Sequence, residues 1–270
     1  MNDPFWEHKD ATYRNLRKGM LVIAIVFPLF LWGVGELWYG VELQPSMSAY
    51  YSAGPRPGLE KGGWLRSSLA AVDAPPLEWL LGFLDETEGA APLRTWFVGM
   101  LFVLGFSLIL YEGIDRWDNL LLNLAGGGAL VVAVFPASCD TCAKGPIHAT
   151  AAILSFVFLA IVGCKTAVDR IRSVRNGDPT AGVYRGLYLL VAFLMVAGPL
   201  TAFAMTLLRG WVYGTYGVFI AELVGLWAFG AYWFILSAEM RREVGDRAIK
   251  AAVRVLDPVI TLPKRGVIHD

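Results

Sequence analysis

The sequence predicts an all-α polytopic membrane protein with six transmembrane helices and with both termini in the cytoplasm. Three observations predict this fold class: the composition, six long apolar stretches, and an uneven distribution of Lys and Arg. Of the 270 residues, 56% are hydrophobic and 17% are charged, and the mean hydropathy is +0.52. Such values are typical of membrane proteins and exclude an ordinary soluble domain of this length.

Each of the six apolar stretches is long enough to cross a bilayer. Crossing the hydrocarbon core takes roughly 20 residues of helix, and a helix satisfies its own backbone polar groups, as a lipid environment requires. Charged residues, Gly and Pro separate the stretches from one another. We predict helices at residues 19–41, 95–113, 119–137, 147–166, 184–208 and 213–237.

The orientation follows from Lys and Arg, which collect at the cytoplasmic ends of membrane helices. Of the 23 Lys and Arg residues, 17 belong to the N-terminal flank, to the connections after the second and fourth stretches and to the C-terminal tail taken together, and six belong to the other connections. We therefore predict a multi-pass protein of the cell inner membrane, with a transmembrane domain over 1–240 and a basic cytoplasmic tail over 241–270. The net charge of zero gives no reason to expect a nucleic-acid partner.

The outer connection over 42–94 is the longest one between predicted helices. It is rich in Gly and Pro over 54–63, and the apolar residues of 77–84 follow Pro75 and Pro76. This pattern fits a short amphipathic helix on the outer headgroup surface. A lid packed over the bundle is the alternative.

Cys139 and Cys142 form a C-x-x-C motif in the short outer connection before the fourth helix. A location outside the cytoplasm favours a disulfide between them, which is our preferred interpretation. Membrane thiol–disulfide oxidoreductases also place such pairs near a quinone site. They relay electrons through a second thiol pair, however, and the sequence offers one further cysteine, Cys164, which cannot form such a pair alone. Zinc or copper held with Asp140 and His148 would need ligand spacings that the sequence lacks. We predict no metal and no cofactor.

Two polar residues within the predicted helices, His148 and Glu222, are the candidates for catalysis. His148 lies at the outer end of the fourth helix, and Glu222 lies about nine residues into the sixth, near the middle of the bilayer. Polar groups at this depth are costly unless they face the bundle interior or a wet cavity. A cluster of both with Glu36 would suit proton-coupled transport, acid–base hydrolysis or recognition of a lipid headgroup. For His148 the alternative is an interfacial side chain bonded to a loop carbonyl.

The run from Ala125 to Ala129 contains three consecutive glycines inside an apolar stretch. Small residues in a membrane helix allow neighbouring backbones to approach closely. We therefore predict that this run packs against another helix and does not bind phosphate.

Several short motifs follow one another as they do in a known group of proteins. They are Pro45-x-x-Ser48 after the first helix, Pro92 and Phe97 entering the second, Asn123 in the third, and Ile147-His148 entering the fourth. With these motifs the chain resembles the DRAM/FRAG/SFK group of six-helix membrane proteins. It also resembles a bacterial family of uncharacterised six-helix membrane proteins whose first outer loop carries a similar Ser-Ala-Tyr-Tyr element.

The resemblance implies lipid-related work, because eukaryotic members of the group are associated with glycolipid-anchor remodelling, autophagy and lipid asymmetry. It points to Ser48 and His148 as the positions to carry over. Two departures concern the ligand: Ala49-Tyr50 stands where the eukaryotic members have an acidic residue, and residues 55–91 look inserted.

From these observations we expect a protein that binds or handles a membrane lipid at the outer leaflet, with no defined reaction. The residues expected to line its outward opening are Ser48, Tyr50, Tyr51, Arg94 and His148. One alternative is a membrane thiol–disulfide oxidoreductase that uses the C-x-x-C pair. The other is a non-catalytic subunit or assembly factor, with a membrane protein complex as its partner.

Overall fold

All regular structure in the described part of the chain is helical, as the sequence predicts. The computed structural model describes residues 4–59, 62–69, 91–113, 115–135, 144–175, 178, 180–207 and 216–260. The long helices are α1 (Pro4–Leu37), α4 (Arg94–Leu110), α5 (Arg116–Val134), α6 (Lys144–Arg175), α7 (Ala181–Leu207) and α8 (Gly217–Ile260). Two short helices, η1 (Met47–Tyr51) and α2 (Trp64–Leu69), lie in the connection after α1.

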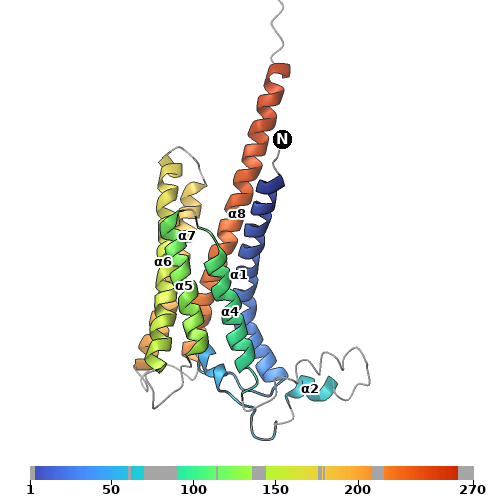
Figure 1. Ribbon diagram of the computed structural model, residues 1–270, viewed down its shortest axis with the longest axis vertical. Helices are drawn as coiled ribbons and strands as arrows, with labels where there is room; N and C mark the ends of the chain where they lie inside the picture. Colours follow the sequence, from blue (N-terminus) through green and yellow to red (C-terminus); the bar gives the residue numbers. More distant parts are fainter. Residues whose placement is uncertain are drawn as a thin grey trace, which may run out of the picture.

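The long helices run roughly along the long axis of the molecule (Figure 1). The start of α1 and the end of α8 lie at the same end of the bundle, at the top of Figure 1, whereas η1 and α2 lie at the other. We call these the terminal end and the η1 end. The first residues of α1 and the last residues of α8 therefore lie at the same end of the bundle.

Five helices in the described ranges have the length and hydropathy that a membrane crossing needs. They are Ala11–Leu37, Arg116–Val134, Pro146–Ile171, Ala181–Met205 and Gly217–Arg242. The remaining long helix, Arg94–Leu110, is apolar but shorter, at 17 residues. Large apolar side chains such as Ile25, Val103 and Phe193 are exposed on the outside of the bundle, as contact with lipid requires. The multi-pass, all-helical prediction is thus confirmed, and a sixth span stays a prediction.

The helices extend further into polar sequence than we predicted. Helix α1 begins at Pro4 rather than at 19, α6 ends at Arg175 rather than at 166, and α8 ends at Ile260 rather than at 237. Hydropathy locates only the apolar part of a helix, while the polar continuations contain many Ala, Arg, Glu and Lys residues, which are good helix formers. Residues 241–260 of the predicted tail therefore continue α8.

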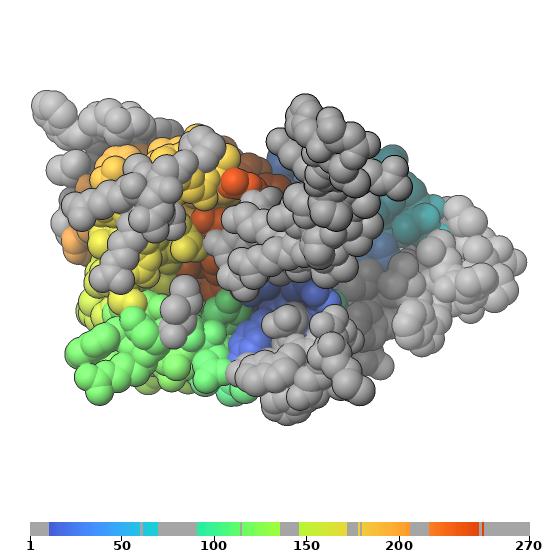
Figure 2. Space-filling view, turned by 90° about the horizontal axis from the view of Figure 1, so that it is seen from above, coloured from blue at the N-terminus to red at the C-terminus, as the bar shows by residue number. Residues whose placement is uncertain are grey.

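The six long helices form a closed ring. Each packs against its neighbours in the chain, from α1 to α4 and onward to α8, and α8 returns to pack against α1. Seen from above, α5, α6 and α7 follow one another along one side, and α8 lies between them and α1 (Figure 2). Short connections favour contact between successive helices, but the closure between α1 and α8 joins the two ends of the chain.

Glycines bring α4, α5 and α6 close together. A Cβ atom on Gly126 of α5 would press against the carbonyl oxygen of Gly105 on α4, and one on Gly128 would meet Ser155 of α6. Gly127, between them, faces open space. The prediction that this run serves close helix packing is confirmed.

Charged and aromatic side chains fill the ring toward its terminal end. Glu239 of α8 is 5% exposed and accepts a hydrogen bond from the Tyr188 hydroxyl of α7 at 2.7 Å. Its other oxygen lies 2.7 Å from Nε of Arg170 on α6. The rings of Tyr232 and Trp233 meet edge to face next to this group, with centroids 5.1 Å apart. This end of the ring is therefore a packed core.

The same end is tied together at its edge. Trp233 packs edge to face on Tyr111 with centroids 4.7 Å apart, and Arg17 of α1 donates to the Tyr111 hydroxyl at 3.1 Å. Asp115 caps the start of α5 and accepts from Lys165 of α6 at 2.5 Å. The Lys165 hydrogen bond holds the pKa of the Asp115 carboxyl below its ordinary value.

Candidate functional site

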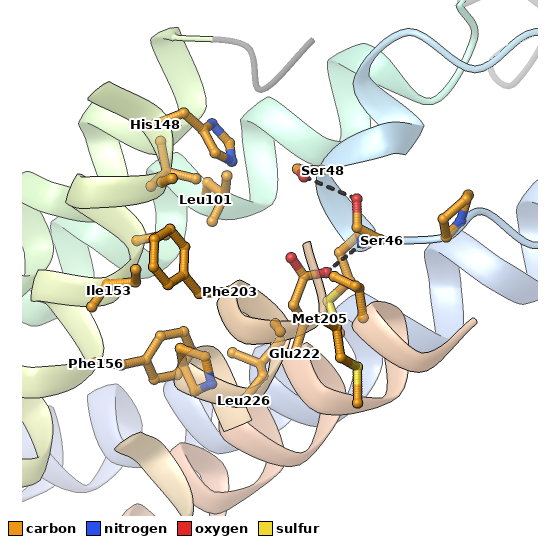
Figure 3. Close-up of a pocket in the computed structure, with 18 of the residues that line it drawn as sticks. Ser46, Ser48, Leu101, His148, Ile153, Phe156, Phe203, Met205, Glu222 and Leu226 are labelled. Atoms are coloured by element: carbon orange, nitrogen blue, oxygen red, sulfur yellow. Dashed lines mark hydrogen bonds between the residues drawn. The ribbon is translucent and has the colours of Figure 1, made fainter. Parts of the chain in front are cut away.

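A cavity of about 630 Å³ lies inside the ring at the η1 end (Figure 3). Its volume falls within the range of roughly 300–1,000 Å³ that is typical of small-molecule sites. All six long helices and the connection before η1 contribute to its walls. Most of the lining side chains are apolar, and they include Phe27, Phe97, Leu101, Val132, Ile153, Phe156, Phe203 and Leu226.

Four polar residues line the same cavity: Ser46, Ser48, His148 and Glu222. His148 projects from the wall formed by α6, and Ser46, Ser48 and Glu222 form the facing wall (Figure 3). The two serine Oγ atoms lie 3.1 Å apart. The cavity thus combines an apolar body with a small group of polar side chains, the usual composition of a ligand site.

The connection before η1 is fixed onto the start of α8. The Phe219 amide donates to the Pro45 carbonyl at 2.8 Å, and the Met47 amide donates to Oε2 of Glu222 at 2.6 Å. Ser46 caps η1 by accepting from the Ala49 amide at 3.2 Å. These contacts hold both serines at the cavity.

The structure corrects the expected depth of Glu222. Helix α8 begins at Gly217 rather than at 213, so Glu222 lies in its second turn and not about nine residues inside it. Its half-buried side chain reaches the cavity and bonds the connecting segment instead of standing in the middle of the span. The physical reason is that hydropathy depends on composition and not on backbone hydrogen bonds, so it does not locate the first residue of a helix.

His148 is both bonded to a loop carbonyl and part of the cavity. The residue is 7% exposed, and its Nδ1 lies 2.6 Å from the carbonyl oxygen of Phe135, the C-cap of α5. A carbonyl oxygen only accepts hydrogen bonds, so Nδ1 carries the proton. In the neutral ring, Nε2 is therefore an acceptor.

Three other residues that we expected at the opening are not among the cavity-lining residues. Tyr50 is fully buried, and its hydroxyl accepts from the Gln44 amide at 3.3 Å. Burial raises the pKa of Tyr50 to about 12. Arg94 of α4 donates to the Tyr51 carbonyl at 3.0 Å and lies 4.8 Å from the centre of the Tyr51 ring. Tyr50 and Tyr51 belong to η1, and their contacts with Gln44 and Arg94 fix η1 from outside the cavity.

Glu36 does not join His148 and Glu222 either. Its carboxylate lies 2.5 Å from Nη2 of Arg56, whose Nε lies 2.8 Å from Glu42. This group of one cation and two carboxylates holds the outer connection to the end of α1. The expected three-residue cluster is therefore reduced to two residues at the cavity.

Sequence reasoning missed Ser46 and the apolar walls of the cavity. A serine before Met47–Tyr51 is a helix-capping signal that could have placed Ser46 beside Ser48. The walls had no such signal, because apolar residues that face a cavity and those that face lipid look alike in a membrane sequence. The rotation of each helix decides between them.

The C-x-x-C pair, Cys139 and Cys142, lies outside the described residues, as does the interfacial helix expected at 77–84. The described cysteine, Cys164, is exposed and free. In the part of the chain that the structure describes, no three His, Cys, Asp or Glu side chains come together as metal ligands would.

Comparison of the chain with protein-family models, with curated proteins and with solved structures found no match. The resemblance to the DRAM/FRAG/SFK group therefore stays a prediction.

Proposed function

We propose that this protein binds or handles a membrane lipid in the ring cavity and takes it from the outer leaflet, with no defined reaction. The observation that carries the proposal is the shape and lining of the cavity. An apolar body suits a hydrocarbon chain, and the polar group formed by Ser46, Ser48, His148 and Glu222 suits a headgroup. The packed core at the terminal end favours a binding site over an open channel.

The cavity is not fully enclosed, which supports this proposal. Phe203 of α7 lines the cavity and is 43% exposed. Pro45 and Pro146, also cavity-lining, are exposed as well. A hydrocarbon chain could enter past these residues without first crossing water, which the hydrophobic effect favours.

We further propose six spans, cytoplasmic termini and an inner-membrane location. Helix α4, with 17 residues, is about 25 Å long, and a small mismatch with the bilayer core costs little. Arg17, Lys165 and Arg170 lie toward the terminal end, in line with the enrichment of basic residues on the cytoplasmic side. This orientation directs the η1 end, and with it the cavity, toward the outer leaflet.

A cavity-filling substitution tests the proposal. The full-length protein would be reconstituted in nanodiscs with a photoreactive diacylglycerol or, in a parallel sample, with a photoreactive phospholipid, and crosslinking would be quantified by mass spectrometry. Ala152→Phe places a ring at a cavity-lining position of α6, whereas Ala204→Phe, the matched control, adds the same ring at an exposed position of α7.

We expect crosslinks at cavity residues in the parent protein and in Ala204→Phe, and a loss of about tenfold in Ala152→Phe. Elution as a single species in size-exclusion chromatography confirms that each variant is folded. Crosslinking that avoids the cavity, or that is equal in both variants, would refute lipid binding at this site.

A further inference from the structure

We infer that the cavity selects a lipid headgroup that donates hydrogen bonds and carries no negative charge, such as a hydroxyl or an amine. This inference rests on the proposed lipid binding and adds the chemical class of the ligand. It follows from which atoms at the cavity already have partners and which do not.

The two ionisable side chains offer acceptors to the cavity. The proton on Nδ1 of His148 is used by the Phe135 carbonyl, which leaves Nε2 of the neutral ring as an acceptor. Oε2 of Glu222 accepts from the Met47 amide, and Oε1 accepts no hydrogen bond from the described residues. A ligand that donates to Nε2 and Oε1 would satisfy both atoms.

Donors are scarce at the same site. The Ser46 and Ser48 hydroxyls are the side-chain donors among the described cavity-lining residues, and the 3.1 Å contact between them occupies one of the two. Ser46 is further engaged as the acceptor of the Ala49 amide. A phosphate or carboxylate headgroup, which needs several donors, would find few here.

Two described cations near this end, Arg94 and Arg56, are held by other partners outside the cavity. Arg94 binds the Tyr51 carbonyl, and Arg56 is paired with Glu36 and with Glu42. The described lining contains no Lys or Arg that could bind an anion, and the ionisable group that Glu222 adds to it is a carboxyl and not a cation. Charge and hydrogen bonding therefore favour the same class of headgroup.

Competition between single-chain amphiphiles of equal chain length tests the inference. The photoreactive lipid that crosslinks in the cavity would be displaced, in zwitterionic nanodiscs, by 1-tetradecylglycerol, tetradecylamine, tetradecanoic acid or tetradecyl phosphate. We expect the glycerol ether or the amine to displace it at about tenfold lower concentration than either anion. Both can donate hydrogen bonds to the acceptors of the cavity, whereas an anionic headgroup would lack donors there.

A variant pair identifies which donor is used. Glu222→Gln keeps an oxygen that can accept from the Met47 amide, so the fold is expected to hold, but it removes the charge. If the headgroup is an amine, this variant weakens displacement by tetradecylamine about tenfold and leaves the glycerol ether nearly unchanged. If it is a hydroxyl, the glycerol ether is the preferred competitor. Glu36→Gln, outside the cavity, is the control and should alter neither.

The outcomes separate the two proposals. Displacement by the glycerol ether or the amine ahead of both anions supports the inference. Equal or better displacement by an anion overturns the headgroup class but leaves lipid binding intact. Failure of both the photoreactive diacylglycerol and the photoreactive phospholipid to crosslink in the cavity overturns the proposed function itself.

Discussion

Replacing Glu239 by alanine is expected to lower the free energy of unfolding by about 3–5 kcal/mol. The carboxylate is 5% exposed and joins three helices, because it lies on α8, accepts from Tyr188 of α7, and pairs with Arg170 of α6. Removing one member of a buried ion pair leaves the other without its counter-charge, which is the main part of the cost.

The geometry accounts for this magnitude. The Arg170 guanidinium approaches both carboxylate oxygens: Nη2 donates to Oε2 at 2.9 Å, and Nε lies 2.7 Å from Oε1 without the geometry of a hydrogen bond. A hydrogen bond between two charged groups is stronger than one between neutral groups. The Tyr188 hydroxyl, at 2.7 Å, loses an acceptor in a buried position, which adds about 1 kcal/mol. Glu239→Gln, which can still accept from Tyr188, should lose less.

Unfolding in mixed detergent micelles, followed by far-ultraviolet circular dichroism, measures the effect. Arg242→Ala is the control, because its guanidinium lies 3.4 Å from Asp178 at an exposed site, where ion pairs contribute about 0–1 kcal/mol. A loss below about 1 kcal/mol for Glu239→Ala, or one equal to that of the control, would refute the buried-pair argument.

The glycine contacts and the α5 cap give two further expected outcomes. Gly126→Leu should destabilise the bundle by about 1–3 kcal/mol, because the new side chain overpacks against Gly105. Gly127 faces open space, so Gly127→Leu should destabilise it by under about 0.5 kcal/mol. Equal effects of the two substitutions in the same micelle assay would contradict this. The pKa of Asp115 is lowered by Lys165, so its contribution to stability is present above the unfolded pKa of about 4 and is lost as pH falls through the lower folded value. Melting temperatures of the parent and Asp115→Asn should therefore differ at pH 7 and converge in acid, and a gap that persists in acid would argue against the ion pair.

The sequence was sufficient for the membrane class, because hydropathy over a window of about 20 residues depends only on local composition. It was not sufficient for the ring, since the contact between α1 and α8 joins residues at opposite ends of the chain. The residues of the candidate site were likewise predicted only in part from the sequence. His148 was identifiable as a polar residue in an apolar stretch and Ser48 through the motif of the family resemblance, but the placement of Arg94 on Tyr51 depends on how η1 docks. That docking depends on the Met47–Glu222 hydrogen bond, which spans 175 residues of chain.

The position of the cavity follows from side-chain volume along the ring. Six helices in a ring leave more space at their axis than two packed helices do, and protein interiors are filled to a high density. Toward the terminal end that space is taken by Tyr188, Tyr232 and Trp233, all buried. At the η1 end, inner positions of α6 and α7 hold the small side chains of Ala152 and Ala202, and space remains. A mostly apolar wall disfavours water, so a hydrocarbon ligand would complete the core there, and its binding would stabilise the folded ring by mass action.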